Sequence, residues 1–179
     1  PGEGRSRWSG VIYGPRALPG RGVRVRGLCG LRDDAARIAG DLGADPALIS
    51  MGVRFGAPRL LAVCDGFEVA VRAVLGQQVS ALREDLLGRL VALCGDELEN
   101  GDALEGTPLL FPTAQQVAAA DLDAMPLPRS RRATLRGLAE AVAGGAVDLS
   151  PGVDPASTRA ALLALPGIGP WTADYISLR

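Results

Sequence analysis

Hydrophobic residues recur at intervals of three and four positions along most of the chain beyond residue 56. This spacing places them on one face of a helix, because an α-helix turns once in about 3.6 residues. We predict helices that begin near Asp65, lie within residues 82–93, follow Pro112 and occupy residues 129–143. Their predicted inward faces consist of Phe67, Val71, Val74 and Leu75, of Leu82, Leu86, Leu87, Leu90 and Leu93, and of Leu135, Leu138, Ala139 and Val142.

Residues typical of helix ends stand at the borders of these segments. Asp65 is a candidate N-cap with Glu68 as an acidic partner three residues on, and residues 112–116 carry a similar start signal. Gly95 and the pair Gly144-Gly145 are predicted to end helices. The caps and the periodicity therefore agree on where the helices lie.

Two further helices are predicted near the end of the chain. Asp154 followed by Pro155 is a start signal, and the helix is expected to reach Leu165. Residues 166–169, Pro-Gly-Ile-Gly, form a predicted four-residue turn, and Pro170 opens the next helix. The pattern is thus helix, tight turn, helix.

The first part of the chain has a different pattern. Residues 8–13 and 22–27 are short and strand-like, with apolar and arginine positions alternating in the second, and residues 31–42 have helical spacing. We therefore predict a mainly α protein: a partial N-terminal α/β domain, an antiparallel sheet plus a helix, over residues 1–55, and a helical domain over residues 56–179.

Composition excludes much catalytic chemistry. The chain has no His, and all 19 of its basic residues are Arg, so histidine bases, histidine-ligated metals and lysine Schiff bases are excluded. Cys29, Cys64 and Cys94 form no C-x-x-C pair and are interpreted as buried or idle thiols in a reducing compartment. No apolar stretch approaches the roughly 18 residues of a membrane span. We expect a cytoplasmic protein with no membrane partner.

Charge gives two opposing indications about nucleic acid. A net charge of −1 argues against binding by bulk electrostatics. The arginines are nevertheless clustered, within residues 1–37 and again within residues 129–136. Such clusters either approach a polyanion or form an ordinary solvated face.

The turn at residues 166–169 carries the candidate chemistry. Backbone N–H groups at the start of a helix have no intrahelical acceptor and lie at the positive end of the helix dipole. The N–H groups of Gly167 and Gly169 could therefore hold an anion such as phosphate without any basic side chain. The alternative is a tight corner in which glycine only relieves crowding.

Residues 165–173, Leu-Pro-Gly-Ile-Gly-Pro-Trp-Thr-Ala, resemble the hairpin of the helix–hairpin–helix DNA glycosylase superfamily. Residues 65–80, 111–113 and 125–132 add matches, in order, to the bacterial 3-methyladenine DNA glycosylase II branch. The resemblance implies base-excision repair: hydrolysis of the N-glycosidic bond of an alkylated purine, of the 3-methyladenine or 7-methylguanine type, flipped out of duplex DNA. The expected partner is double-stranded DNA containing alkylated bases, bound by a monomer.

The resemblance also implies residue roles. DNA phosphate would be held at Gly167, Gly169 and the turn around Thr172, and Gln78 would be the wedge that enters the gap left by the flipped base. No organic cofactor is implied. A monovalent cation, Na⁺ or K⁺, would be bound by backbone carbonyls that belong to Leu163, Leu165 and Ile168.

Trp171 and Tyr175 stand four residues apart on the helix after the turn and so share a face. An electron-rich aromatic face attracts a cationic alkylpurine, so this pair is a candidate base pocket, although aromatic stripes also fill cores. Trp171 occupies the position where superfamily members that also nick DNA, such as endonuclease III, have a nucleophilic lysine. A monofunctional hydrolase is therefore implied.

The catalytic Asp of the superfamily follows the hairpin helix after a further loop, a position that the resemblance places beyond Arg179. The catalytic residue is thus unknown, and we expect this fragment of a glycosylase to be inactive as given. Asp174 is interpreted as a polar helix position. The alternatives are a non-catalytic helix–hairpin–helix DNA-binding module and a mismatch-specific glycosylase of the same superfamily.

Overall fold

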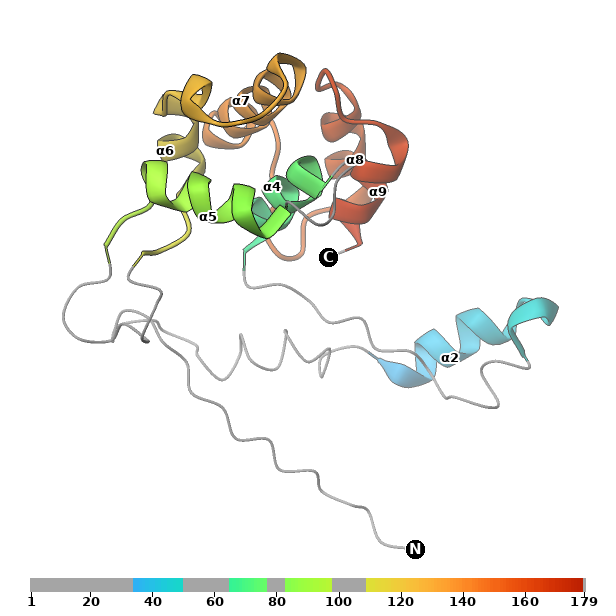
Figure 1. The fold of residues 1–179 in the computed structure, drawn as a ribbon. Coiled ribbons are helices and arrows are strands. Elements are labelled where there is room, and N and C mark those ends of the chain that lie inside the picture. Colours follow the sequence, from blue (N-terminus) through green and yellow to red (C-terminus); the bar gives the residue numbers. More distant parts are fainter. Residues whose placement is uncertain (1–33, 50–64, 77–82, 98–108, 179) are drawn as a thin grey trace, which may run out of the picture.

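The computed structural model describes residues 34–49, 65–76, 83–97 and 109–178. Helices dominate this part of the chain, and its only strand-like pairing is an isolated bridge between Glu97 and Leu109 (Figure 1). The helices are α2 (Ala35–Gly43), α4 (Gly66–Gly76), α5 (Arg83–Cys94), α6 (Ala114–Ala119), the 3₁₀ turn η2 (Leu122–Ala124), α7 (Arg129–Ala143), α8 (Pro155–Leu163) and α9 (Pro170–Ser177). The prediction of a mainly α protein is confirmed.

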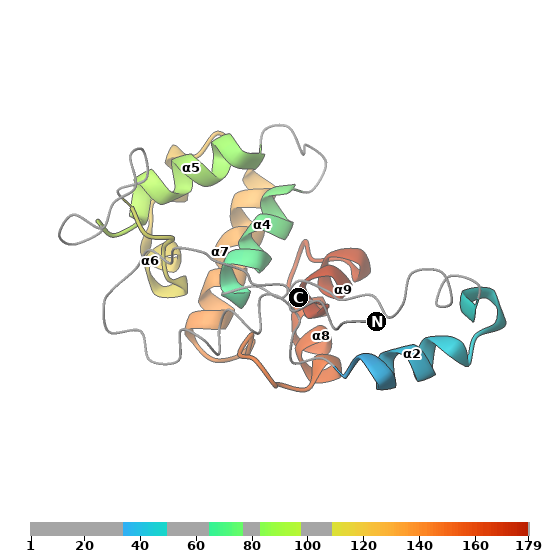
Figure 2. The same ribbon diagram turned by 90° about the horizontal axis from the view of Figure 1, so that it is seen from below.

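Within residues 1–55, the described part consists of α2 and a further helical stretch at residues 46–49. The N-cap of α2 is Asp34, whose carboxylate accepts hydrogen bonds from the N–H groups of Ala36 and Arg37. Figure 1 shows α2 apart from the other helices, and Figure 2 shows it extending to the side of the bundle that holds α8 and α9. The predicted strands at residues 8–13 and 22–27 lie outside the described residues, so the sheet and the division at residue 55 stay predictions.

Helix α4 is the centre of the bundle and packs against α5, α7 and α9. Asp65 caps it, accepting hydrogen bonds from the N–H groups of Phe67 at 2.7 Å and Glu68 at 3.3 Å, as predicted. Its buried residues cover most of the helix surface, apart from the side of Glu68 and Arg72: Phe67, Val69, Ala70, Val71, Ala73, Val74 and Leu75. Such a helix is stabilised mainly by removal of apolar surface from water.

Helices α5 and α6 cover one side of this core. Leu86, Leu87 and Leu90 are buried as predicted, whereas Leu93 is 38% exposed because α5 ends one residue later. Gly95 follows that end, and its N–H donates to the carbonyl of Val91. Helix α6 begins with a complete capping box between Thr113 and Gln116.

Helix α7 has the bounds predicted from its periodicity. Leu135, Leu138 and Ala139 are fully buried, and the helix ends at Gly144-Gly145, where Gly145 has a φ of +76°. Arg132, near its start, donates to the carbonyl of Leu127 at 2.9 Å and lies 3.1 Å from a carboxylate oxygen of Asp123. At least one member of the 129–136 arginine cluster is therefore used to fix the segment before α7.

Helices α8 and α9 pack against each other, and α9 also packs on α4. Asp154 caps α8, accepting from the N–H of Ser157, and Pro155 stands in the first turn, as predicted. Helix α8 ends at Leu163, two residues before the predicted Leu165. Among the described residues, no helix is long and apolar enough to cross a membrane.

Candidate nucleic-acid interface

The turn between α8 and α9 is fixed to the bundle by one side chain. Ile168, in the middle of the turn, is 5% exposed and belongs to the core. Its N–H donates to the carbonyl of Leu165 at 3.2 Å, which closes the turn. Gly167 and Gly169 flank this anchor and are both exposed. The glycines thus stand on either side of a buried isoleucine.

Gly167 is required by the protein's own structure. Its φ is +86°, in the left-handed region that L residues rarely adopt. A Cβ atom at this position would lie 2.0 Å from Oγ1 of Thr134, a buried residue of α7. That hydroxyl donates to the carbonyl of Ser130, which holds the threonine in place. The close packing of hairpin on α7 therefore permits only glycine.

Gly169 is not required in the same way. It is the N-cap of α9 with a φ of −90°, a conformation open to any residue. A Cβ atom built on it would meet nothing within 4 Å. Within the described structure the space beside Gly169 is open, so no contact of the described residues requires a glycine here. A glycine would be required if a ligand or another segment approached this backbone closely. The two interpretations of the turn, crowding and anion binding, thus each fit one of the glycines.

Unpaired donors gather at the same place. The N–H groups of Gly167, Gly169 and Trp171 have no hydrogen-bond acceptor among the described residues, and all three residues are exposed. Pro170 has no N–H to offer. The side chain of Thr172 is 4% exposed, so this residue would contribute through its backbone. Open N–H groups at the positive end of a helix suit a phosphate.

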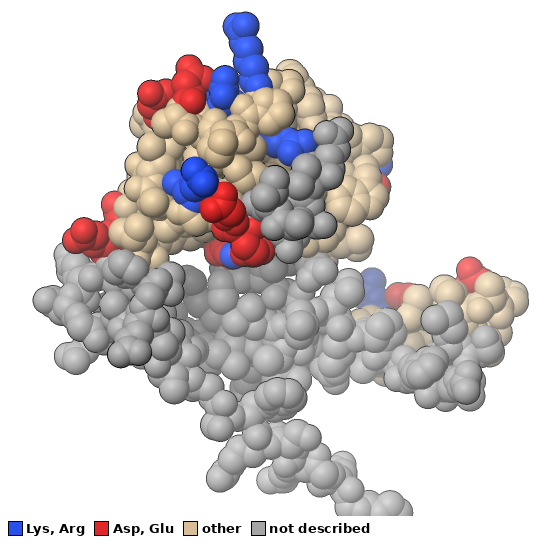
Figure 3. Space-filling view, in the orientation of Figure 1, with Lys and Arg blue, Asp and Glu red and all other residues tan. Residues whose placement is uncertain are grey.

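Charged side chains do not supply an alternative anion site on the face drawn in Figure 3. The described residues there present scattered arginines and acidic groups on a largely uncharged surface, with no continuous basic area. This agrees with the net charge of −1.

Trp171 and Tyr175 form a stacked pair on α9. Their ring centroids lie 5.5 Å apart, and the ring planes differ by 17°. Trp171 is 70% exposed, whereas Tyr175 is half-buried and packs against the core. The tryptophan thus lies outside the core that the described residues form, and the pair offers an aromatic surface directly after these N–H groups.

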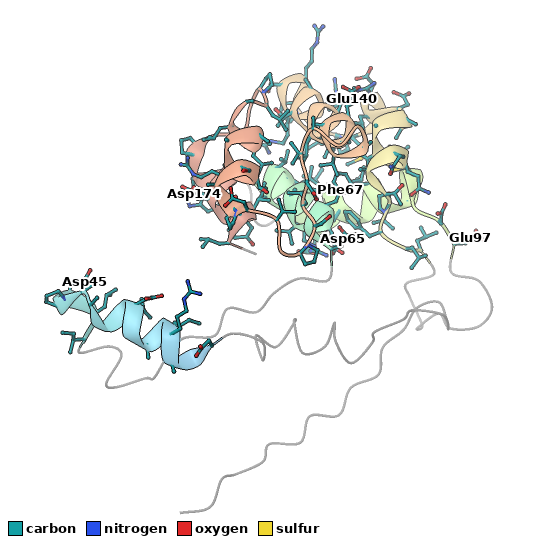
Figure 4. The ribbon with its side chains drawn as sticks, turned by 180° about the vertical axis from the view of Figure 1, so that it is seen from behind. Asp45, Asp65, Phe67, Glu97, Glu140 and Asp174 are labelled. Carbon is teal, nitrogen blue, oxygen red and sulfur yellow. The ribbon has the colours of Figure 1, made fainter. Side chains whose placement is uncertain are left out.

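Asp174, between the two aromatic residues in sequence, is paired with Arg159 of α8. Figure 4 shows Asp174 at the edge of the bundle, on the α8–α9 unit. The hydrogen bond from Arg159, together with the charge of Asp174, raises the pKa of the guanidinium above its ordinary value. A carboxylate held in this way is a poor candidate for a catalytic base, which agrees with its interpretation as a polar helix position.

Other predicted residues have different outcomes. Gln78 lies outside the described residues. Of the three carbonyls proposed to hold a cation, that of Leu165 already accepts the N–H of Ile168, which leaves it one lone pair. Among the described residues, no group of three or more His, Cys, Asp or Glu side chains could hold a metal ion.

Cys94 is half-buried, and burial raises the pKa of its thiol.

Two contacts of the site were not predicted. Thr134 and Gly167 are 33 positions apart, and Arg159 and Asp174 lie on different helices. Neither pair shares a periodic pattern, because only the packing of α7, α8 and α9 brings their members together. A charged residue on each of two helices joined by a short turn is the only signal that could have suggested the second pair.

A solved structure has the same fold as this chain. The chain is similar to the structure of MBOgg1 in complex with a low-affinity DNA ligand, with a TM-score of 0.67 and 21% identity, over 90% of this chain and 56% of that one. This likeness shows that the two chains share a fold. No family model matches the sequence.

Curated relatives narrow the class. The chain is 39% identical over 159 residues to the probable bifunctional transcriptional activator/DNA repair enzyme AlkA of Mycobacterium tuberculosis (strain CDC 1551 / Oshkosh). It is 36% identical over 148 residues to DNA-3-methyladenine glycosylase 2 of Escherichia coli (strain K12). These matches cover 88% and 78% of this chain but 32% and 51% of the relatives. The resemblance to the 3-methyladenine DNA glycosylase II branch is confirmed, for a chain that spans at most about half of these relatives.

Proposed function

We propose that the chain is the DNA-gripping and base-stacking part of a monofunctional DNA glycosylase that removes alkylated purines from duplex DNA. The hairpin would hold a phosphate, and the Trp171–Tyr175 pair would receive the flipped base. The reaction would be hydrolysis of the N-glycosidic bond, as part of base-excision repair. The names of the curated relatives support this assignment.

One observation carries the proposal. An exposed tryptophan stacked on a half-buried tyrosine stands on α9, directly after a turn in which the N–H groups of Gly167 and Gly169 have no acceptor among the described residues. A single DNA strand could therefore place one of its phosphates at the turn and one of its bases on the aromatic rings. Exposure of a large aromatic side chain has a cost in water, which binding of a planar ligand would remove.

The chemistry of the substrate fits an aromatic surface. Alkylation at N3 or N7 gives the purine a positive charge, which weakens its bond to the sugar and draws it to the face of an electron-rich ring. Such cation–π attraction contributes about 0.5–2 kcal/mol, depending on how far both partners are desolvated. A base that leaves readily needs less help from the protein, so stacking and a carboxylate that assists water would be sufficient.

Further parts of the proposal come from the resemblance. Gln78 would fill the gap in the duplex, and a monovalent cation would bind the carbonyls of Leu163, Leu165 and Ile168, for which neutral oxygens are suitable ligands. The catalytic Asp would follow Arg179. The protein would act as a cytoplasmic monomer, with residues 1–55 and 56–179 as its two domains.

The experiment compares two glycine variants in their binding to a fluorescently labelled duplex. Gly169→Ala adds a methyl group where the chain itself leaves open space, but where a bound phosphate would lie. We expect its affinity for DNA to fall at least tenfold with little change in the thermal unfolding midpoint. The slope of log affinity against log salt should decrease by about 0.9 for each phosphate that the variant no longer binds.

Gly88→Ala is the matched control, because a Cβ atom at Gly88 of α5 also meets nothing within 4 Å. It should leave DNA affinity unchanged. Equal affinity of the Gly169→Ala variant and the unaltered chain would contradict phosphate binding at the hairpin.

A second measurement concerns excision. Alkylated duplex DNA is incubated with the 179-residue chain, and free bases are separated by chromatography. We expect no release of 7-methylguanine, because the described residues of the site include no carboxylate free to assist water. Detectable release would contradict the placement of the catalytic Asp beyond Arg179.

A further inference from the structure

The exposed face of α9 carries more than aromatic rings. Residues three, four and seven positions apart share a helix face, which groups Trp171, Asp174, Tyr175 and Leu178. Trp171 is 70% exposed and Leu178 is 66% exposed, whereas the opposite face, Thr172, Ala173 and Ile176, is buried. A charged carboxylate therefore lies on the same face as the candidate base platform.

Arg159 balances this carboxylate from the neighbouring helix. The ion pair joins α8 to α9, with 43% of the arginine and 49% of the aspartate side chain exposed. Between residues 154 and 178 the only other charged side chain is Asp154, the N-cap at the far end of α8. Within residues 154–178 this pair therefore adds no net side-chain charge, and removal of either member leaves a single charge on the α8–α9 unit.

The position of this pair lets it influence ligand choice. A unit charge about 8 Å from a cationic ligand changes its binding by about two- to fivefold when the intervening dielectric is close to that of water. A lone carboxylate would favour a cationic base, and a lone guanidinium would oppose it. With both present, the rings alone decide how strongly a cation is preferred over a neutral base.

We propose that the Arg159–Asp174 pair determines base specificity: it keeps the surroundings of the Trp171–Tyr175 platform neutral, which limits the preference for cationic alkylpurines and leaves neutral bases able to bind. This inference rests on the proposed function of the platform. Asp174 is here a specificity-determining residue, not a catalytic one, and an exposed pair of this kind contributes little to folding stability.

The test measures the ratio of two affinities: that for a duplex with one 7-methylguanine and that for the same duplex with guanine. Arg159→Gln leaves the carboxylate alone and should raise the ratio about two- to fivefold. Asp174→Asn leaves the guanidinium alone and should lower the ratio by a similar factor. The double variant should return the ratio to that of the unaltered chain.

Arg89→Gln is the control, because Arg89 forms an exposed ion pair with Asp85 on α5, a helix outside the site. It removes the same charge and should leave the ratio unchanged. Because the ratio compares two duplexes, a general loss of structure or of phosphate binding moves both affinities together and cancels.

The outcomes separate this inference from the proposed function. Suppose that the unaltered chain prefers the 7-methylguanine duplex. If the two single variants then shift the ratio of affinities in the same direction, or leave it unchanged, the specificity role is contradicted. The proposed function is not affected by that result. An unaltered chain that binds both duplexes equally would contradict the platform itself, and with it this inference.

Discussion

Helices α4 and α9 pack against each other, yet core packing explains the apolar residues of the first helix much better than those of the second. In α4, seven of the 11 residues are buried, and they leave only a narrow stripe with Glu68 and Arg72 partly exposed. In α9 three of eight residues are buried, all on one side, and the opposite side carries an exposed tryptophan. Packing accounts for nearly every apolar residue of α4. It does not account for the exposed Trp171, for which we propose a role in stacking on the flipped base.

The same contrast exists within the hairpin. The fold itself requires a glycine at position 167, because of the positive φ and the close approach of Thr134. Gly169 has neither constraint. Residues that the fold requires and residues that a ligand requires can therefore be separated by substitution, because the first kind should change stability and the second kind should change binding.

The largest effect on stability is expected in α4. Leu75 is fully buried, so Leu75→Ala should lower the free energy of unfolding by about 2–5 kcal/mol through lost burial and the cavity it leaves. Chemical denaturation monitored by circular dichroism measures this change. A loss below about 1 kcal/mol would show that α4 is not the centre of the fold.

Gly167→Ala should follow, with a loss of about 1–3 kcal/mol from the strained backbone. The added Cβ would also collide with Thr134, so part of the loss should be recovered in the double variant with Thr134→Ala. Strictly additive losses in the denaturation of the three variants would mean that the two residues do not touch.

A smaller, pH-dependent effect is expected at the start of α8. Hydrogen bonds from the hydroxyl and N–H of Ser157 hold the pKa of Asp154 below its ordinary value. The folded pKa is lower than the unfolded one, so this stabilisation is complete above the unfolded pKa and is lost as pH falls through the folded pKa.

Asp154→Ala should therefore lower the thermal midpoint by a few degrees at pH 7, and the difference should disappear toward about pH 2. Asp154→Asn, which keeps a capping side chain, should remain near the unaltered chain at pH 7. A difference that grows as the solution is acidified would contradict the direction of the pKa shift.

The smallest effect on stability is expected at Trp171. Because this side chain is largely in water, Trp171→Ala should change the free energy of unfolding by at most about 0.5 kcal/mol. The same variant should lose its preference for a duplex that contains 7-methylguanine. Denaturation and DNA titration of one preparation test both points, and a large loss of stability would assign Trp171 to the core after all.

Local signals in the sequence predicted much of this structure. The bounds of α7, the caps at Asp65, Thr113 and Asp154, and the turn at residues 166–169 follow from short-range rules of periodicity and capping. The prediction extended α8 to Leu165, although the helix ends at Leu163. Leu165 instead belongs to the turn, where its carbonyl accepts the hydrogen bond from the N–H of Ile168.

Long-range contacts were beyond such rules. The position of Thr134 against Gly167 depends on how α7 approaches the hairpin, and nothing within either segment encodes that distance. The exposure of Trp171 is similar: spacing placed it on a face with Tyr175, but only the packed structure shows which side of α9 that face is on.

The stacked aromatic pair also provides an intrinsic fluorescent probe of the candidate site. Trp171 is one of only two tryptophans in the chain, the other being Trp8. With Trp8 replaced by phenylalanine, all indole fluorescence would originate from a ring that lies in water, 5.5 Å from its tyrosine neighbour. Insertion of a purine against that ring would quench the emission, so the arrival of a flipped base could be timed in solution without attaching any dye.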